Sequence, residues 1–266
     1  MTDSPNNCAG CPMAAPGRLE QLGLNMDDAD YVVALAGNPN VGKSTVFNAL
    51  TGLRQHTGNW PGKTVARAEG AYTYDGRTYK LVDLPGTYSL LSTSRDEEIA
   101  RDFLLFGRPD VTLVVVDASR LERNLNLALQ VLAITDRAVV CLNLIDEAAR
   151  RGIRVDERRL ARDLGVPVVP TAARQGQGLP ELLRAVADVA EGRAVCRPHR
   201  IQPRSAALGR AVAELEAQIG AAFPDLPNAR WVALRLLDGD EAIARAVRSG
   251  ELSALAGRQQ LPEAAR

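Results

Sequence analysis

A glycine-rich segment starting at Gly37 carries the clearest chemistry in the sequence. It reads Gly37-Asn38-Pro39-Asn40-Val41-Gly42-Lys43-Ser44 and fits the pattern GxxxxGK[ST] between an apolar run and a helical pattern. The glycines let successive backbone N–H groups point inward at a helix N-terminus, which favours an anion. Lys43 can then neutralise β- and γ-phosphates, and the Ser44 hydroxyl can coordinate Mg²⁺. We predict a phosphate loop; the alternative is a glycine-rich turn with a surface lysine.

Two later segments predict which base is bound. Asn143-Leu144-Ile145-Asp146 follows an apolar run, and Thr171-Ala172-Ala173 follows the next one. Open α/β sheets present ligand contacts at such places. A carboxylate can accept the N1–H and N2–H of guanine, and a backbone N–H of Thr171-Ala172-Ala173 suits guanine O6 and repels the amino group of adenine. Either segment alone could be a helix cap, but their order favours GTP over ATP.

Two further segments predict loops that respond to the γ-phosphate. Asp83-Leu84-Pro85-Gly86 ends an apolar run, so Asp83 can hold the Mg²⁺ shell and the Gly86 N–H can contact the γ-phosphate. Thr64 lies in the preceding loop and can close on Mg²⁺ with its hydroxyl, although it could also simply begin a strand. Both contacts exist only with the γ-phosphate present, so hydrolysis would release both loops.

Short apolar runs alternate with helical patterns from residue 31 to 192, which indicates an α/β domain around a mostly parallel sheet flanked by helices. Strands are expected at Tyr31–Gly37, Val65–Tyr74, Thr78–Asp83, Val111–Asp117, Ala138–Asn143 and Val166–Pro170. Helices are expected at Lys43–Thr51, after a Ser94/Glu97 capping box, and at Pro180–Ala190. Asp75-Gly76 predicts a hairpin turn, and Gly52–Lys63 is expected to be a loop.

The flanking segments differ from this pattern. Residues 193–266 are expected to form a small all-helical domain, because Leu208, Val212, Leu215 and Ile219 recur at helical spacing. Shorter helical patterns follow at Trp231–Leu237, Glu241–Val247 and Leu252–Leu255, with Trp231 expected in a core. Residues 1–30 are expected to be a flexible extension. Cys8 and Cys11 form a CxxC there, for which metal or redox function is a weaker hypothesis than a disordered tail.

Composition narrows the class of protein. The 32 Lys+Arg balance 32 Asp+Glu, and no basic run marks a nucleic-acid partner. No segment approaches the roughly 18–20 apolar residues of a spanning helix, and no secretory signal begins the chain. Taken alone, these 266 residues predict a soluble intracellular protein.

The loops between the motifs resemble the bacterial ferrous-iron transport family FeoB. The resemblance is carried by Thr51–Val65, which contains Gly58-Asn59-Trp60-Pro61-Gly62, by Asp83–Leu90, and by Asn228–Leu237. It covers residues 31–240. It implies a cytosolic GTPase domain, a helical domain resembling a guanine-dissociation inhibitor, and a membrane permease domain for Fe²⁺ that is absent from these residues. We therefore expect the protein to lie at the cytoplasmic face of the bacterial inner membrane. We also expect that it can form a homo-oligomer, a dimer or a trimer. Deleting residues 200–266 should alter GDP affinity or release.

The motifs and the resemblance together imply a set of site residues. Those expected to contact GTP or GDP are Gly37, Asn38, Pro39, Asn40, Val41, Gly42, Lys43, Ser44, Gly62, Lys63, Thr64, Val65, Ala66, Asp83, Leu84, Pro85, Gly86, Asn143, Leu144, Ile145, Asp146, Thr171, Ala172 and Ala173. Ser44, Thr64 and Asp83 are expected to hold Mg²⁺. Catalytic roles are expected for Lys43, Thr64, Gly86 and Asn40.

The resemblance also implies a monovalent cation. In potassium-stimulated members an asparagine equivalent to Asn40 helps to bind K⁺, with backbone carbonyls expected here from Gly58 and Trp60. Such a cation could stabilise transition-state charge as an arginine finger does.

One position departs from better-known GTPases. Thr87 follows Asp-x-x-Gly, where many of them have a glutamine that orients the attacking water. Thr87 is too short for that role, so we predict slow intrinsic hydrolysis with water positioned by backbone groups of the Thr64 loop. Two other functions stay open at this point: a ribosome- or tRNA-associated GTPase, and a GTP-dependent interaction module with negligible hydrolysis.

Overall fold

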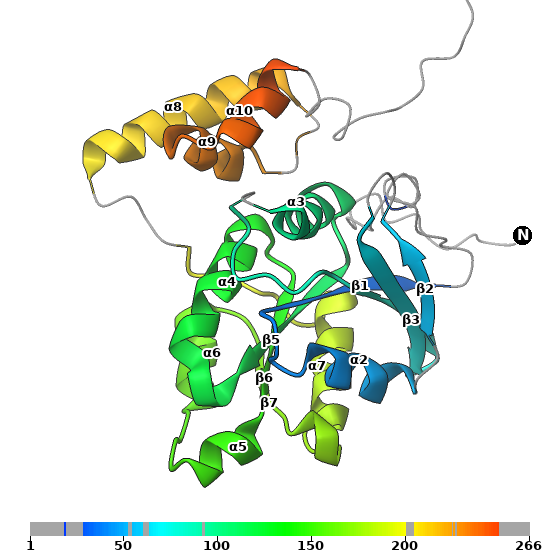
Figure 1. Cartoon of the computed structure of the whole chain (residues 1–266). Coiled ribbons are helices and arrows are strands. Elements are labelled where there is room, and N and C mark those ends of the chain that lie inside the picture. The colour runs from blue at the N-terminus through cyan, green and yellow to red at the C-terminus, as the bar shows by residue number, and fades with distance from the viewer. Residues whose placement is uncertain are drawn as a thin grey trace, which may run out of the picture.

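The structure is a computed structural model. It describes residues 19, 29–52, 55–60, 64–91, 94–200, 205–224, 226 and 228–249. We call residues 29–200 the sheet domain and residues 205–249 the helical unit, and the helical unit lies above the sheet domain in Figure 1.

A sheet with the strand order β2-β3-β4-β1-β5-β6-β7 forms the centre of the sheet domain. Its strands are β1 (Tyr31–Gly37), β2 (Gln55–Asn59), β3 (Ala66–Tyr74), β4 (Arg77–Asp83), β5 (Val111–Asp117), β6 (Ala138–Asn143) and β7 (Val168–Pro170). Pairing is parallel from β4 through β1, β5 and β6 to β7. It is antiparallel at β2–β3 and β3–β4. The predicted α/β fold with a mostly parallel sheet is confirmed.

Helices cover both faces of the sheet, and each face has its own apolar core. One core combines side chains of α2 (Lys43–Thr51) and α7 (Leu179–Ala190) with Val33 and Leu35 of β1. The other contains the alternate β1 residues Val32 and Ala34. Its helical contributions come from α3 (Arg95–Asp102), the π-helical turn η1 (Phe103–Gly107), α4 (Leu121–Ile134), α5 (Ile145–Arg150) and α6 (Glu157–Leu164). Coverage on both faces explains why every residue of β5 is buried and why five of its seven residues are apolar.

Several local predictions are confirmed, and two need correction. Asp75 and Gly76 have φ of 49° and 73°, as a tight hairpin turn requires. The expected loop at Gly52–Lys63 is wrong in part, because β2 pairs there with β3 at the sheet edge. The capping box is half formed: Ser94 caps the Glu97 N–H, but the Glu97 carboxylate accepts from the Ser89 hydroxyl instead.

The helical unit consists of α8 (Ala206–Ala222), α9 (Ala229–Leu237) and α10 (Glu241–Arg248). The predicted burial of Trp231 is confirmed, and the side chain is only 5% exposed. Trp231, Val232 and Ile219 belong to the same core cluster as α3 and α4 of the sheet domain. The two parts therefore share one apolar core, which favours a fixed contact over free movement. The expected Leu252–Leu255 helix, Cys8 and Cys11 lie outside the described residues.

The segment between the two parts packs on the sheet domain. Arg197 N–H donates to Gly165 O, and His199 N–H donates to Leu164 O. Arg200 forms an ion pair with Asp136 at 2.5 Å. The sheet domain's contacts thus extend to residue 200.

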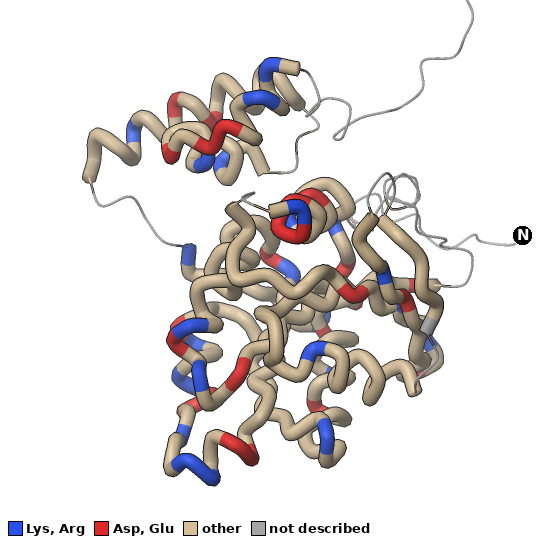
Figure 2. Tube along the Cα trace, in the orientation of Figure 1, with Lys and Arg blue, Asp and Glu red and all other residues tan. Residues whose placement is uncertain are grey.

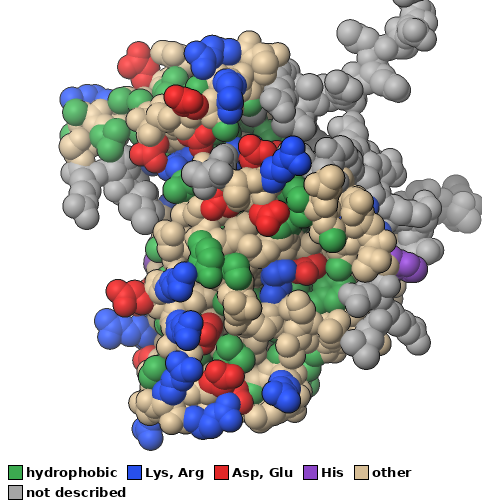
Figure 3. All heavy atoms as spheres, viewed as in Figure 1, with side chains coloured by type: hydrophobic (Ala, Val, Ile, Leu, Met, Phe, Trp, Pro, Cys, Tyr) green, Lys and Arg blue, Asp and Glu red, His purple; other side chains and the backbone are tan. Residues whose placement is uncertain are grey.

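Charge is mixed along the described chain. Basic and acidic residues alternate through both parts in Figure 2, and they are interspersed on the face shown in Figure 3. Among the residues that the structure describes, no helix is long and apolar enough to cross a bilayer.

Candidate nucleotide-binding site

The loop between β1 and α2 has the backbone shape that a phosphate loop needs. Asn40 and Gly42 have φ of 65° and 82°, so the chain curls before α2 begins at Lys43. A Cβ at Gly42 would lie 2.4 Å from Asn143 Nδ2, and a Cβ at Gly37 would lie 2.8 Å from Val115 O. Neither position has space for a side chain, which explains both glycines of the motif.

Lys43 is held at this loop by the end of β4. Its ammonium group forms an ion pair with the Asp83 carboxylate and donates to Leu84 O at 2.7 Å. Burial raises the pKa of Asp83, and the positive charge of Lys43 opposes that rise. The expected phosphate ligand and the expected Mg²⁺ ligand therefore neutralise each other in this structure, and a bound Mg²⁺–nucleotide would replace that pairing.

The Asp83–Gly86 segment lies directly against the phosphate loop, because β4 and β1 are neighbouring parallel strands. Leu84 N–H donates to Leu35 O, and Thr87 N–H donates to Gly37 O at 3.4 Å. A Cβ at Gly86 would lie 3.5 Å from the backbone of Pro39. The structure thus brings the expected γ-phosphate contact beside the loop.

Asn143 joins the phosphate loop to the two segments expected to read guanine. This side chain is 1% exposed and donates to Val41 O at 3.0 Å. Its Oδ1 accepts from Thr171 Oγ1 at 3.2 Å and from Ala173 N at 3.1 Å. One buried amide therefore fixes three loops from the ends of β1, β6 and β7.

Asp146 lies in the first turn of α5, after Leu144 with a φ of 62°. Its carboxylate accepts from Gln175 Nε2 at 3.0 Å and from Arg150 at 3.4 Å. These neighbours hold the carboxylate at the edge of the site where the sequence places the base.

The guanine O6 contact implied for the Ala172 N–H stays a prediction. That N–H donates to Gln177 O and closes an isolated bridge, and the Thr171 N–H donates to Leu142 O. The Ala173 N–H is bonded to the Asn143 side chain. A guanine O6 at the Ala172 N–H would therefore replace the bond to Gln177 O.

The Thr64 loop is not assembled on the phosphate loop. Gly58 lies in β2 opposite Arg67 of β3, β3 pairs with β4, and β4 pairs with β1. Three strand spacings separate Gly58 from β1, or about 14 Å. Thr64 is exposed, and Gly62 and Lys63 lie outside the described residues. β2, which contains Gly58, therefore lies three strands from β1, and the potassium ligands stay a prediction.

Trp60 anchors this loop in the apolar core. Its side chain is 4% exposed and meets Phe103 of η1 edge to face, with 5.5 Å between ring centroids. Arg67 lies over its ring at 5.3 Å, and Trp60 N–H donates to Val65 O. The packing of the Trp60 side chain, together with the hydrogen bond to Val65 O, thus fixes the backbone at Trp60.

Sequence reasoning missed a polar cavity behind the phosphate loop. The cavity has a volume of about 60 Å³ and is lined by Asn38, Tyr88, Asp117 and Asn124 among others. Asn38 is 2% exposed, and both of its amide atoms are without a hydrogen-bond partner among the described residues. Its position in the motif gave no signal, because the second residue of GxxxxGK[ST] is unrestricted.

Comparison with known proteins gives the family. The sequence model of the family "Ferrous iron transport protein B" matches residues 31–186, and that of the "FeoB cytosolic helical domain" matches residues 205–264. The chain belongs to the ferrous iron transport protein B family.

Individual relatives agree with this assignment to the FeoB family. The chain is 42% identical over 212 residues to the Fe(2+) transporter FeoB of Salmonella choleraesuis, which covers 78% of this chain and 27% of the relative. It is 41% identical over 214 residues to the Fe(2+) transporter FeoB of Escherichia coli K12, and this alignment also covers 78% of this chain and 27% of the relative. The chain thus spans about a quarter of the length of these relatives.

Solved structures match across both parts. The cytosolic domain of L. pneumophila FeoB has a TM-score of 0.75 at 34% identity, covering 86% of this chain and 90% of that one. The cytosolic domain of T. maritima FeoB, described as a GDP form, has a TM-score of 0.75 at 37% identity, covering 85% and 91%. The sheet domain and helical unit therefore correspond to the FeoB cytosolic fold.

Proposed function

We propose that this chain is the GTP-binding and GTP-hydrolysing cytosolic head of a bacterial Fe²⁺ transporter, and that its nucleotide state regulates iron uptake. The observation that carries the proposal is the Asn143 junction, which holds the phosphate loop and both guanine segments in one arrangement. A GDP form of the T. maritima relative and the name of the Salmonella relative support it. The division into residues 31–192 and 193–266 is part of the proposal.

The site's own residues perform most of the binding. Backbone N–H groups of the loop and the Lys43 ammonium neutralise the phosphates, while the Asp146 carboxylate accepts from guanine. The hydroxyls of Ser44 and Thr64 and the carboxylate of Asp83 supply the hard oxygen ligands that suit Mg²⁺, which would neutralise phosphate charge when bound. Thr64 is exposed in the segment after β2, and we expect its loop to close on the nucleotide.

A potassium site at Asn40, Gly58 and Trp60 belongs to the same closing movement. Amide and carbonyl oxygens are suitable ligands for K⁺, which would add positive charge beside the transferred phosphate. Single-turnover GTP hydrolysis should be at least about tenfold faster in K⁺ than in Na⁺; equal rates would contradict the potassium site.

Slow intrinsic hydrolysis follows from the position of Thr87. This residue is 5% exposed, and its N–H donates to Gly37 O, so the side chain is packed into the loop junction. Water would then be oriented by backbone groups of the Thr64 loop. This leaves hydrolysis dependent on that loop's closure.

Guanine recognition is tested by Asp146→Asn. The variant exchanges a carboxylate for an amide whose N–H₂ group repels the N2 amino group of guanine but can donate to O2 of xanthine. GDP affinity should fall about 100-fold and XDP affinity should rise, as measured by calorimetry. Unchanged preference for GDP over XDP would contradict the role of Asp146. Glu157→Gln, at the start of α6, provides a matched control.

Regulation of transport is tested in the full-length protein. Lys43→Ala removes the charge expected to neutralise phosphate, so Fe²⁺ uptake by cells that depend on this transporter should fall by at least fivefold. Radioactive iron uptake at equal protein levels measures this. Uptake equal to that of the unmodified protein would contradict nucleotide regulation.

A further inference from the structure

Helix α4 contacts the segment after Asp83–Gly86 at several points. The Leu90 N–H donates to Gln130 Oε1 at 2.6 Å. Near the start of the helix, the Arg123 guanidinium lies 4.5 Å from the centre of the Tyr88 ring. Asn124 also lines the cavity behind Asn38. The γ-phosphate-facing segment is therefore bonded to a single rigid helix of 14 residues, about 21 Å long.

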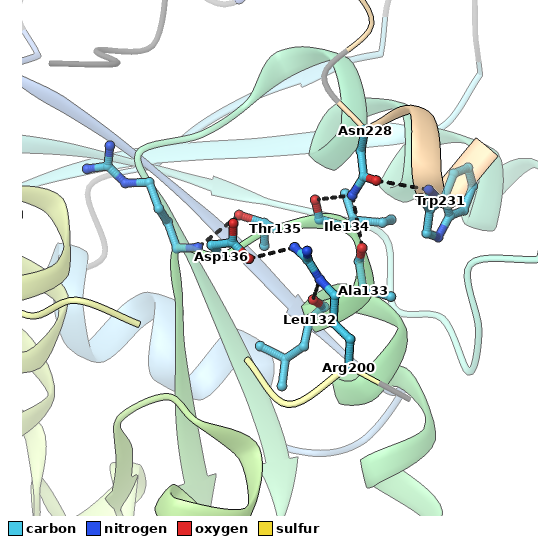
Figure 4. A network of polar contacts seen from close by, with 9 residues as sticks. Leu132, Ala133, Ile134, Thr135, Asp136, Arg200, Asn228 and Trp231 are labelled. Atoms are coloured by element: carbon cyan, nitrogen blue, oxygen red, sulfur yellow. Dashed lines mark hydrogen bonds and ion pairs between the residues drawn. The ribbon is translucent and has the colours of Figure 1, made fainter. Parts of the chain in front are cut away.

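The other end of α4 is bonded to the helical unit. The last carbonyls of a helix have no partner within it. Asn228 Nδ2 donates to both Ala133 O and Ile134 O at 2.9 Å (Figure 4). Arg200 Nε donates to the preceding carbonyl, Leu132 O, at 3.4 Å. The segment before α9 thus satisfies the carbonyl end of α4.

The same Asn228 side chain begins α9. Its Oδ1 accepts from the Trp231 N–H at 2.9 Å, and Figure 4 shows the amide between α4 and Trp231. Trp231 packs in the core that both parts share. One amide therefore fixes the end of α4 and the start of α9 together, so a displacement of either helix must disturb the other.

We propose that Asn228 is the positioning residue through which the helical unit and the Tyr88–Leu90 segment influence each other along α4. The inference rests on the proposed function, since it describes how that nucleotide site is regulated. When the segment after Gly86 rearranges with the γ-phosphate, Leu90 and Tyr88 pull on α4, and Asn228 transmits the shift to α9. Conversely, releasing Asn228 loosens α4 and changes nucleotide release.

Fluorine NMR provides a direct test, because Trp231 reports on the helical unit and the chain has one other tryptophan, Trp60. The protein is labelled with 5-fluorotryptophan, and Trp60→Phe and Trp231→Phe assign the signals. Binding of GDP and of a non-hydrolysable GTP analogue is measured separately by calorimetry. We expect the Trp231 signal to shift between the two nucleotides, and Arg123→Ala to abolish that shift while both nucleotides still bind.

Each outcome decides a different claim. Binding without any change at Trp231, or a shift that survives Arg123→Ala and Gln130→Ala together, would overturn the route through α4 and leave the proposed function standing. Failure to bind either nucleotide would overturn the proposed function and this inference with it. Glu122→Ala, one residue from Arg123 and exposed, should leave the shift intact.

A second measurement separates coupling from simple stability. Asn228→Asp keeps the oxygen that caps α9 but replaces the donor to Ala133 O and Ile134 O with a negative charge. About 16 Å of helix separates Arg123 from Ile134, so independent effects should multiply. We expect Arg123→Ala and Asn228→Asp each to change the GDP dissociation rate about threefold or more. The double variant should not exceed the larger single effect; a product of the two would overturn the proposal.

Discussion

The two halves of the nucleotide site differ in how they are held. Asn143 ties the phosphate loop to the guanine segments through three hydrogen bonds at 1% exposure, so this half is already assembled. The half containing Thr64 is instead bound to a sheet edge through β2, and Trp60 is its buried anchor. We therefore expect recognition of guanine and phosphate to be rigid, and we expect the response to the γ-phosphate to release β2 and the Trp60 side chain from their present contacts.

Removing the Asn143 side chain should have the largest effect. Asn143→Ala removes the partner of the Val41 carbonyl and of the Ala173 N–H and leaves the Thr171 hydroxyl only the Cys141 thiol, at a cost of about 3 kcal/mol or more. GDP affinity should fall at least about 100-fold in calorimetry, because three loops lose their common tie. Asn126→Ala, on the exposed side of α4, serves as the control. If GDP affinity falls less than threefold, Asn143 does not organise the phosphate loop and the guanine segments.

Removing the Trp60 side chain, which anchors the half that contains Thr64, should lower the free energy of unfolding with little effect on GDP affinity. Trp60→Ala opens a cavity beside Phe103, so the free energy of unfolding should fall by about 3 kcal/mol. GDP affinity should change less than about threefold, because the guanine and phosphate contacts are intact. Trp60→Phe, which keeps an aromatic ring in the core, should lose less stability. A large loss of GDP affinity with Trp60→Ala would show that the two halves are not independent.

Thr87→Ala should have a smaller effect. The Thr87 N–H donates to Gly37 O, and alanine keeps this bond. Single-turnover GTP hydrolysis should slow less than about threefold, whereas Lys43→Ala should nearly abolish it. Losses of similar size would mean that the Thr87 hydroxyl acts on the attacking water.

The pH dependence of Mg²⁺ binding should be the weakest of these effects. The pKa of Asp83 is raised by burial, so protons compete with Mg²⁺ nearer to neutrality than at an ordinary aspartate. Because only the ionised carboxylate binds the metal, Mg²⁺ affinity of the GDP complex should decrease as pH falls from 7 toward 5. Asp83→Asn should flatten that profile; an unchanged slope would assign the titration to another group.

More of the half organised by Asn143 could be predicted from the sequence than of the half that contains Thr64. The phosphate loop, the Asp146 position and the hairpin at Asp75-Gly76 follow from local patterns whose chemistry depends on a few neighbouring residues. The Asn143 junction could not be derived that way, because its partners at Val41 and Ala173 are 102 and 30 residues distant in sequence. The bridge between Ala172 and Gln177 could not be derived from local patterns either, because it depends on how the loop folds back.

The Thr64 loop shows a second limit. Residues Gln55–Asn59 are polar and glycine-containing, so their pattern favours a loop, yet pairing with β3 makes them a strand. β-structure depends on its neighbour more than on intrinsic preference. The contact of Asn228 with α4 likewise joins residues about 95 positions apart, which no local pattern reveals.

Hydrogen exchange of the backbone amides tests the central comparison most directly. With GDP, amides of β2 paired to β3 should be protected, and with a non-hydrolysable GTP analogue, Mg²⁺ and K⁺ they should lose that protection by at least tenfold as the Thr64 loop leaves the sheet edge. Amides of Thr171 and Ala173 should be equally protected in both complexes. Unchanged protection of β2 between the two nucleotides would contradict the account.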